Sequence, residues 1–300
     1  GYTGYTPNAG YPSLREAFAF RLNSDYGLGI SSERVVVSVG AMGGLFNAFC
    51  AVLTAGDEVL IPDPGYPNYY MAVRLLGARA VPYPLKVEPS GFSIDVENVR
   101  SRITDRTKVL IINSPSNPTG LVENFQTIRA LIDLAQENGI YILSDESYDH
   151  IIYDGEHISP LKFDDKGNVI AVHSCSKTYS MTGWRVGFVV SPLDITPVIS
   201  KLQEAYVSCA PSVSQKAAEA ALSGPQDCVR EMLAVYFKRR QLAMQLCDEL
   251  GINYVRPRGA FYLMVALPER EKHDSMGFAL RLVREARVAV APGVTFGAQG

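Results

Sequence analysis

The residues from Ser174 to Lys177, together with Arg185, form a set that suits a phosphorylated aldehyde. The stretch Ser174-Cys175-Ser176-Lys177 is followed eight residues later by Arg185, within the glycine-containing segment Thr182–Gly187. A lysine amine forms a Schiff base with an aldehyde, and hydroxyl groups with a guanidinium hold a phosphate. A polar loop after a strand would also explain this stretch if it stood alone. Other positions in the chain must therefore distinguish a binding site from an ordinary loop.

Candidate ligand-binding segments also follow three further apolar stretches of strand character. The segments 40–43, 113–120 and 145–148 each come after such a stretch, as the segment 174–177 does. Ligands of open α/β sheets bind in the crevice outside the carboxyl ends of the strands. We therefore expect the four segments to converge on one site.

The chain alternates apolar strands with helical segments, which predicts an α/β fold with helices on both faces of a mostly parallel sheet. Continuous apolar runs such as 108–113 are typical of strands buried on both faces. The segment 188–190 is expected to run against the other strands. Expected strands cover 34–39, 58–61, 78–83, 108–113, 140–144, 169–174 and 188–190, with helices at 42–53, 68–76 and 125–138.

From about residue 194 the pattern changes to long helices and then to a smaller α+β unit. We predict a three-layer large domain over residues 1–235, with an N-terminal arm at 1–10, and a small C-terminal domain over 236–300 that we expect to be incomplete. The junction falls within or after the helix expected at 227–250. The other expected elements are helices 195–207, 212–222 and 276–286 and strands 253–255, 261–266 and 288–291.

Composition and charge exclude several classes of protein. The 300 residues are 47% hydrophobic and 20% charged, with a net charge of −3, so no basic excess points to nucleic acid or to an anionic membrane surface. No apolar run approaches the ~20 residues that cross a bilayer. The five cysteines are odd in number and scattered, which favours a reducing, cytoplasmic location.

The histidines and the cysteine beside Lys177 indicate no further chemistry. The four histidines show no metal-ligand spacing, so we expect no metal site. His173 closes an apolar strand and is expected to pack in the core. Cys175 has no His or Asp partner nearby in the sequence, and we expect a small buried neighbour rather than a reactive thiol.

Taken together, the motifs resemble the class I and II aminotransferases, pyridoxal-phosphate (PLP) enzymes of fold type I. They follow the order of that family across essentially the whole chain. The segments that carry the resemblance are Tyr5-Thr6-Pro7, Gly40-Ala41, Asp63-Pro64-Gly65-Tyr66-Pro67, Asn117-Pro118-Thr119-Gly120, Ser144-Asp145-Glu146-Ser147-Tyr148, Ser174-Cys175-Ser176-Lys177, Arg185-Val186-Gly187 and Pro292-Gly293-Val294-Thr295-Phe296-Gly297.

The resemblance implies roles for four residues around the cofactor ring. Lys177 matches the lysine that forms the Schiff base with pyridoxal 5'-phosphate and then moves a proton, for which its amine must be neutral. Asp145 matches the carboxylate that faces the ring nitrogen and keeps it protonated. Tyr148 and Asn117 match the pair that contacts the ring 3-hydroxyl.

The phosphate group is expected at the start of a helix, where backbone N–H groups and the helix dipole favour an anion. Arg185 adds a charge-assisted contact. For Ser176, a hydroxyl that caps the backbone is nearly as good an interpretation. The residues that the resemblance assigns to the phosphate are Gly40, Ala41, Met42, Ser174, Ser176 and Arg185.

Two tyrosines complete the implied site. Tyr66 would stack on the ring, although it also fits an aromatic cluster with Tyr69 and Tyr70. Tyr5 resembles the tyrosine that reaches the partner subunit's phosphate, which implies a homodimer with a shared site.

The implied reaction is a ping-pong transfer of an amino group between an L-amino acid and a 2-oxo acid. Met42 stands where relatives acting on aspartate can carry a basic residue, which favours apolar or aromatic donors. The family's arginine for the substrate α-carboxylate would follow shortly beyond Gly300, and no residue here is assigned to it. A lyase that eliminates a β- or γ-substituent on the same fold, and a non-enzymatic effector-binding domain, remain as alternatives.

Overall fold

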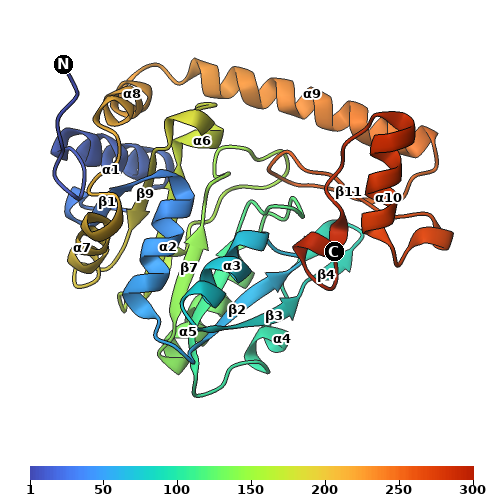
Figure 1. The fold of residues 1–300 in the computed structure, drawn as a ribbon, viewed down its shortest axis with the longest axis horizontal. Coiled ribbons are helices and arrows are strands. Elements are labelled where there is room, and N and C mark those ends of the chain that lie inside the picture. Colours follow the sequence, from blue (N-terminus) through green and yellow to red (C-terminus); the bar gives the residue numbers. More distant parts are fainter.

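The computed structural model describes residues 1–300, and its centre is a seven-stranded sheet (Figure 1). The strands are β1 (Val35–Ser38), β2 (Glu58–Asp63), β3 (Arg79–Pro84), β6 (Thr107–Asn113), β7 (Tyr141–Asp145), β8 (Val169–Ser174) and β9 (Gly187–Val190). Their order is β1-β9-β8-β7-β6-β2-β3. Strand β9 runs antiparallel to β1 and β8, as predicted, and the other pairs are parallel.

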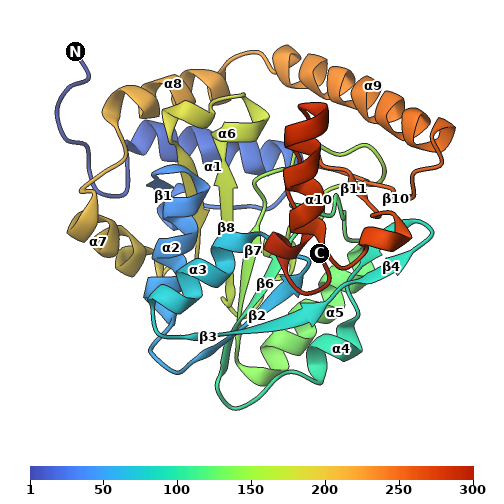
Figure 2. The ribbon, with the colours of Figure 1, turned by 45° about the vertical axis from the view of Figure 1, so that its right-hand side comes forward.

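Helices cover both faces of this sheet and give the predicted three layers (Figure 2). One face carries α2 (Gly40–Val52), α3 (Pro67–Leu75) and α7 (Thr196–Tyr206). The other carries α1 (Pro12–Tyr26) and α5 (Phe125–Asn138), with α8 (Ser212–Ser223) packed on α1. The short helices α4 (Val96–Arg100) and α6 (Cys175–Thr178) lie between strands in the chain.

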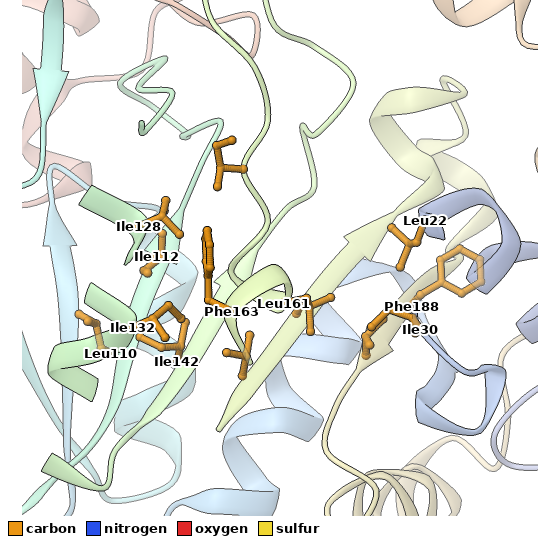
Figure 3. Packing of buried hydrophobic residues seen from close by; sticks show 14 of the residues in the cluster. Leu22, Ile30, Leu110, Ile112, Ile128, Ile132, Ile142, Leu161, Phe163 and Phe188 are labelled. Atoms are coloured by element: carbon orange, nitrogen blue, oxygen red, sulfur yellow. The ribbon is translucent and has the colours of Figure 1, made fainter. Parts of the chain in front are cut away.

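The alternation of side chains along β6 explains why its sequence is a continuous apolar run. Leu110 and Ile112 pack with Ile128 and Ile132 of α5 on one face (Figure 3). Val109 and Ile111 belong to the cluster on the opposite face, with α2 and α3. Because both faces are covered by helices, neither set of side chains needs to be polar.

The C-terminal part contains the long helix α9 (Asp227–Glu249), α10 (Ser275–Arg281) and the antiparallel pair β10 (Tyr254–Val255) and β11 (Met264–Val265). The prediction of a strand at 288–291 was wrong. Val288 and Val290 are 48% and 46% exposed, and no strand lies beside this segment to pair with it. None of the helices is both long and apolar enough for a membrane crossing.

A small hairpin of β4 (Lys86–Glu88) and β5 (Gly91–Ser93) was not predicted. Each of these strands has only three residues and all of β4 is exposed, so the run is too short for its alternation of polar and apolar residues to identify a strand.

Candidate active site

A cavity of about 270 Å³ lies where the carboxyl ends of the strands meet the start of α2. It brings together segments that follow β1, β6, β7 and β8, as the sequence predicts. The predicted residues on its wall are Ala41, Met42, Tyr66, Asn117, Asp145, Tyr148, Ser174, Ser176, Lys177 and Arg185. Leu45, Ser147, Thr182 and Tyr262 also line it and were not predicted.

Asp145 is the last residue of β7 and is buried at the cavity wall. Its carboxylate accepts hydrogen bonds from Tyr69 Oη at 2.6 Å and from Ser147 Oγ at 2.6 Å and N at 3.1 Å. Burial raises the pKa of Asp145 above its usual value, although these hydrogen bonds oppose the shift. A cationic group in the cavity would therefore be a favourable partner for this carboxylate.

Asn113 ties the loop that carries Asn117 to the end of β7. Its Nδ2 donates to the main-chain carbonyl of Asp145 at 3.0 Å, and its Oδ1 accepts from the Asn117 N–H at 2.8 Å. The Oδ1 of Asn117 is buried and has no hydrogen-bond partner within the protein. The side chain of Asn117 is thus left for a ligand. Asn113 belongs to the segment 113–120 that was expected at the site, but no role was predicted for it because it also ends an apolar strand.

Tyr148 meets Tyr262, a residue far away in the sequence. Their hydroxyl oxygens lie 2.5 Å apart. Burial has the largest effect on the pKa of Tyr148 and the neighbouring Tyr262 the next largest. Both raise this pKa well above its usual value, so the phenol stays protonated. The only signal for Tyr262 in the sequence is the aromatic pair Phe261-Tyr262. Such pairs are common in protein cores, so Tyr262 was not predicted as a site residue.

Lys177 lies in α6, with its Nζ 5.8 Å from the ring centre of Tyr148 and 5.4 Å from that of Phe261. Burial and the nearby Arg185 cation lower the pKa of Lys177. Both effects favour the neutral amine, which is the form that attacks an aldehyde or accepts a proton. The neighbouring Cys175 is buried, which raises its thiol pKa to about 12. It therefore stays a protonated thiol near neutral pH.

The part of the cavity beside the start of α2 suits an anion. Helix α2 begins at Gly40, where φ is +67° and an added Cβ would overlap the Arg185 guanidinium. The guanidinium therefore lies against the positive end of this helix, held by a bond from Nη1 to the Thr182 carbonyl at 2.8 Å. Two positive groups facing each other bind an anion such as phosphate.

The two serines near this part of the cavity differ in their contacts. Ser174 Oγ accepts from the Ser176 N–H at 3.1 Å and so caps α6. The alternative interpretation of Ser176 was that its hydroxyl caps the backbone. In the structure, the hydroxyl that caps the backbone is that of Ser174. The Ser176 hydroxyl makes no hydrogen bond within the protein and lies on the cavity wall.

Tyr66 lies on the cavity wall and packs edge-on against Tyr69, with ring centres 5.5 Å apart. Its hydroxyl accepts a hydrogen bond from Asn68 Nδ2 at 2.9 Å, and the same amide lies 3.6 Å from Met42 Sδ. Both interpretations of Tyr66, a ring that faces a ligand and a member of the aromatic cluster, agree with these contacts. Tyr5 is 90% exposed and lies outside the cavity of its own chain.

Comparison with known proteins decides the family. The family model for class I and II aminotransferases matches residues 1–300. A probable aspartate/prephenate aminotransferase of Aquifex aeolicus is 39% identical, over 100% of this chain and 78% of the relative. The chain belongs to the class I and II aminotransferases.

Solved structures of aminotransferases agree with this family assignment. An aromatic aminotransferase from Pyrococcus horikoshii has a TM-score of 0.95 at 37% identity, covering 100% of this chain and 81% of that chain. An aspartate aminotransferase from Thermus thermophilus with maleate has a TM-score of 0.91 at 36% identity, covering 99% and 77%. The predictions of fold type I, of a PLP-dependent aminotransferase, and of amino-acid and oxo-acid substrates are confirmed.

The cavity fits this cofactor. Its wall combines a carboxylate, an amide oxygen without a partner and a lysine with the positive groups formed by Arg185 and the start of α2. A phosphorylated pyridine aldehyde needs the same set of partners.

Proposed function

We propose that Lys177 holds the cofactor aldehyde of this aminotransferase and moves the substrate proton, while Asp145 faces the pyridine nitrogen. The observation that carries this proposal is that both side chains line one cavity with Arg185. PLP supplies an aldehyde that condenses with amines and a ring that withdraws electrons from the substrate Cα. The lowered pKa of Lys177 favours the neutral form of the amine, which is the form that removes the Cα proton.

The other wall residues position the cofactor in this proposal. Asn117 and Tyr148 bind the ring hydroxyl, and Tyr66 packs against the ring. The unpartnered Asn117 amide and the protonated phenol of Tyr148 support these roles. At the other end Gly40, Ala41 and Met42 offer backbone N–H groups to the phosphate, together with Ser174, Ser176 and Arg185.

For the amino donor we propose an L-amino acid with an aromatic or apolar side chain. Met42, Tyr66, Tyr148 and Tyr262 give the cavity aromatic and thioether walls. The cations on its wall, Lys177 and Arg185, already have partners in the proposed cofactor site. A second carboxylate on the substrate would therefore compete with the phosphate for Arg185.

Aspartate is the second candidate donor. Relatives from Pyrococcus horikoshii and Geobacillus stearothermophilus, both 37% identical, are aspartate aminotransferases, and the Thermus thermophilus structure holds the dicarboxylate maleate. A shared family fold leaves such a difference in specificity to a few side chains.

Single-turnover kinetics with a donor panel test both candidates. The holoenzyme is mixed with L-phenylalanine, L-leucine or L-aspartate, and the change in cofactor absorbance gives kmax/Kd for each donor. We expect phenylalanine to exceed aspartate by about tenfold or more, equal to ~1.4 kcal/mol. Met42→Lys should shift this ratio toward aspartate and Met42→Leu should not. A higher value for aspartate in the unmodified enzyme would overturn the first candidate in favour of the second.

We also propose that the enzyme is a homodimer in which Tyr5 of each subunit reaches the phosphate of the other. The 90% exposure of Tyr5 supports this, since its ring is not packed within its own subunit. Mixed dimers of Lys177→Ala and Tyr5→Phe subunits test it. Such a dimer has one site with both residues intact, so activity should exceed the average of the parent dimers. No recovery in a verified mixed dimer would contradict the proposal.

For the organisation of the chain we propose a large domain at 1–235 and a small domain at 236–300, joined within α9. The separate sheet of β10 and β11 supports this division. We propose a cytoplasmic location, which the five free cysteines support.

A further inference from the structure

A buried cluster of two histidines and two carboxylates lies behind the candidate site. Its members are Glu146, Asp149, His157 and His173, and we call it the His–carboxylate cluster. His173 Nδ1 lies 3.3 Å from Asp149 Oδ2, and its Nε2 lies 3.8 Å from Glu146 Oε2. His157 Nε2 lies 2.6 Å from the same Glu146 oxygen. Glu146 is fully buried and His173 is 2% exposed, so His173 lies in the core as predicted, but there it faces two carboxylates.

The charges of this cluster must balance internally. The ion-pair partners of Glu146 and Asp149 are all histidines, and no lysine or arginine reaches either carboxylate. Two buried carboxylates without a cation would be strongly destabilising. His173 faces both of them, and their charges raise its pKa even though burial lowers it. A protonated His173 is therefore the natural counterion.

Groups on the surrounding elements do not replace this counterion. Tyr26 of α1 approaches Asp149, and Asp25 and Asp145 add further negative charge nearby. His150 lies 3.9 Å from Asp149 at the edge of the cluster, and Cys175 is a protonated thiol. On the apolar side the Phe18 ring packs edge-on against His173 at 5.3 Å.

Three of the four cluster members, Glu146, Asp149 and His173, are sequence neighbours of proposed site residues. Glu146 follows Asp145, and Asp149 follows Tyr148. His173 precedes Ser174, and Thr178, which follows Lys177, has its Oγ1 3.5 Å from Asp149 Oδ1. The cluster thus joins the loop after β7 to the turn after β8 at the points where these segments carry Asp145 and Lys177.

We propose that His173 is a positioning residue whose imidazole, held between Glu146 and Asp149, fixes the loop 145–149 against the turn 174–178 and so aligns Asp145 with Lys177. This inference rests on the proposed roles of those two residues. His173 itself does not line the cavity, so it acts through its neighbours.

The first test uses the cofactor-free protein. A histidine whose folded pKa is raised contributes stability below its unfolded pKa, and that contribution is lost as pH rises through the folded pKa. In the unmodified chain we expect the melting temperature to fall as pH rises from the unfolded to the folded pKa of His173. His173→Gln should remove this pH dependence. NMR of the labelled imidazoles should assign a raised pKa to His173. An ordinary or lowered pKa, with unchanged pH dependence in the variant, would overturn the proposal.

The second test measures the half-reaction in the holoenzyme. A displacement of reacting groups by ~1 Å can cost up to ~100-fold in rate. We expect His173→Gln to lower the single-turnover rate constant by about tenfold or more at saturating amino acid, with the donor Kd changed less than about twofold. The pH at which the absorbance of the bound cofactor changes should also shift. Asp149→Asn is a second variant, with a smaller effect of the same kind.

Control variants distinguish a failure of the His173 proposal from a failure of the proposed active site. His273→Gln alters an exposed histidine outside the cluster and should match the unmodified enzyme in every measurement. A His173→Gln protein that is less stable but reacts at the normal rate with a normal pH profile would mean a merely structural role and overturn the inference. If Lys177→Ala also reacts at the normal rate, the proposed site itself is wrong.

Discussion

The Tyr69 hydroxyl donates a hydrogen bond to Asp145 Oδ2 at 2.6 Å, joining helix α3 to the end of strand β7. Both residues are buried. With the two bonds from Ser147, this contact holds the carboxylate in one orientation before any ligand binds. The orientation of Asp145 is therefore a property of the folded chain.

Tyr69→Phe should weaken cofactor binding. The tyrosine hydroxyl lowers the pKa of Asp145, against the raising effect of burial, so its loss favours the protonated acid. A hydrogen bond to a charged group contributes ~1.5–3 kcal/mol, so we expect the Kd for PLP to rise roughly 10- to 100-fold in a fluorescence titration. Tyr70→Phe, the next residue along the helix, is the control. A Kd within twofold of the unmodified value would contradict this account.

Gly40→Ala should impair phosphate binding specifically. Gly40 has φ +67°, and a Cβ there would overlap the Arg185 guanidinium. Gly27→Ala is a matched control, because Gly27 has φ +66° with no atom near an added Cβ. Both variants should lose ~1–2 kcal/mol of stability from the left-handed backbone. Only Gly40→Ala should also weaken PLP binding, by about tenfold or more. Equal PLP affinity in the two variants would remove Arg185 and the start of α2 from the phosphate site.

Tyr148 and Tyr262 should behave as a unit. Their hydroxyl oxygens are 2.5 Å apart, so removing either one leaves the other without its partner. We expect Tyr148→Phe and Tyr262→Phe each to lower the half-reaction rate several-fold, and the double variant to lose less than the product of the two. A coupling energy of at least ~0.5 kcal/mol in the double-mutant cycle is the predicted result. Additive losses would mean that the pair does not act together.

The sequence predicted the cavity wall well because its members follow strands within a few residues. Lys177, Asp145 and Asn117 each belong to a short motif, and the α/β pattern was enough to bring their loops together. Tyr262 and the His–carboxylate cluster were missed because their contacts join residues far apart in the chain, or depend on which way a buried side chain points. No local motif carries that information.

The C-terminal part was harder to predict for a different reason. Val288 and Val290 have strand propensity, but a strand forms only where a neighbour supplies hydrogen bonds, and none lies beside them. Propensity alone therefore gave the wrong element there, whereas β6 was predicted correctly because its apolar residues pack on both faces of a sheet.

The pH dependence of stability should reveal the lowered pKa of Lys177. Its folded pKa lies below its ordinary value of 10.5 because of burial and Arg185, so the cofactor-free protein gains stability as pH rises from the folded value toward 10.5. Lys177→Met removes the unfavourable cation and should be more stable than the unmodified chain below that window, with the advantage vanishing above it. Urea unfolding across pH measures this, with exposed Lys162→Met as the control. A destabilised Lys177→Met at neutral pH would contradict the assignment.

Covalent mapping tests most directly whether Lys177 holds the cofactor aldehyde. The chain is incubated with PLP, reduced with borohydride, digested and analysed by mass spectrometry, beside Lys177→Arg. We predict that the pyridoxyl group is found on the peptide that contains Lys177, in about one copy per chain, and that the variant carries none at that position or elsewhere at comparable yield. A label spread over exposed lysines, equal in the two proteins, would contradict the account.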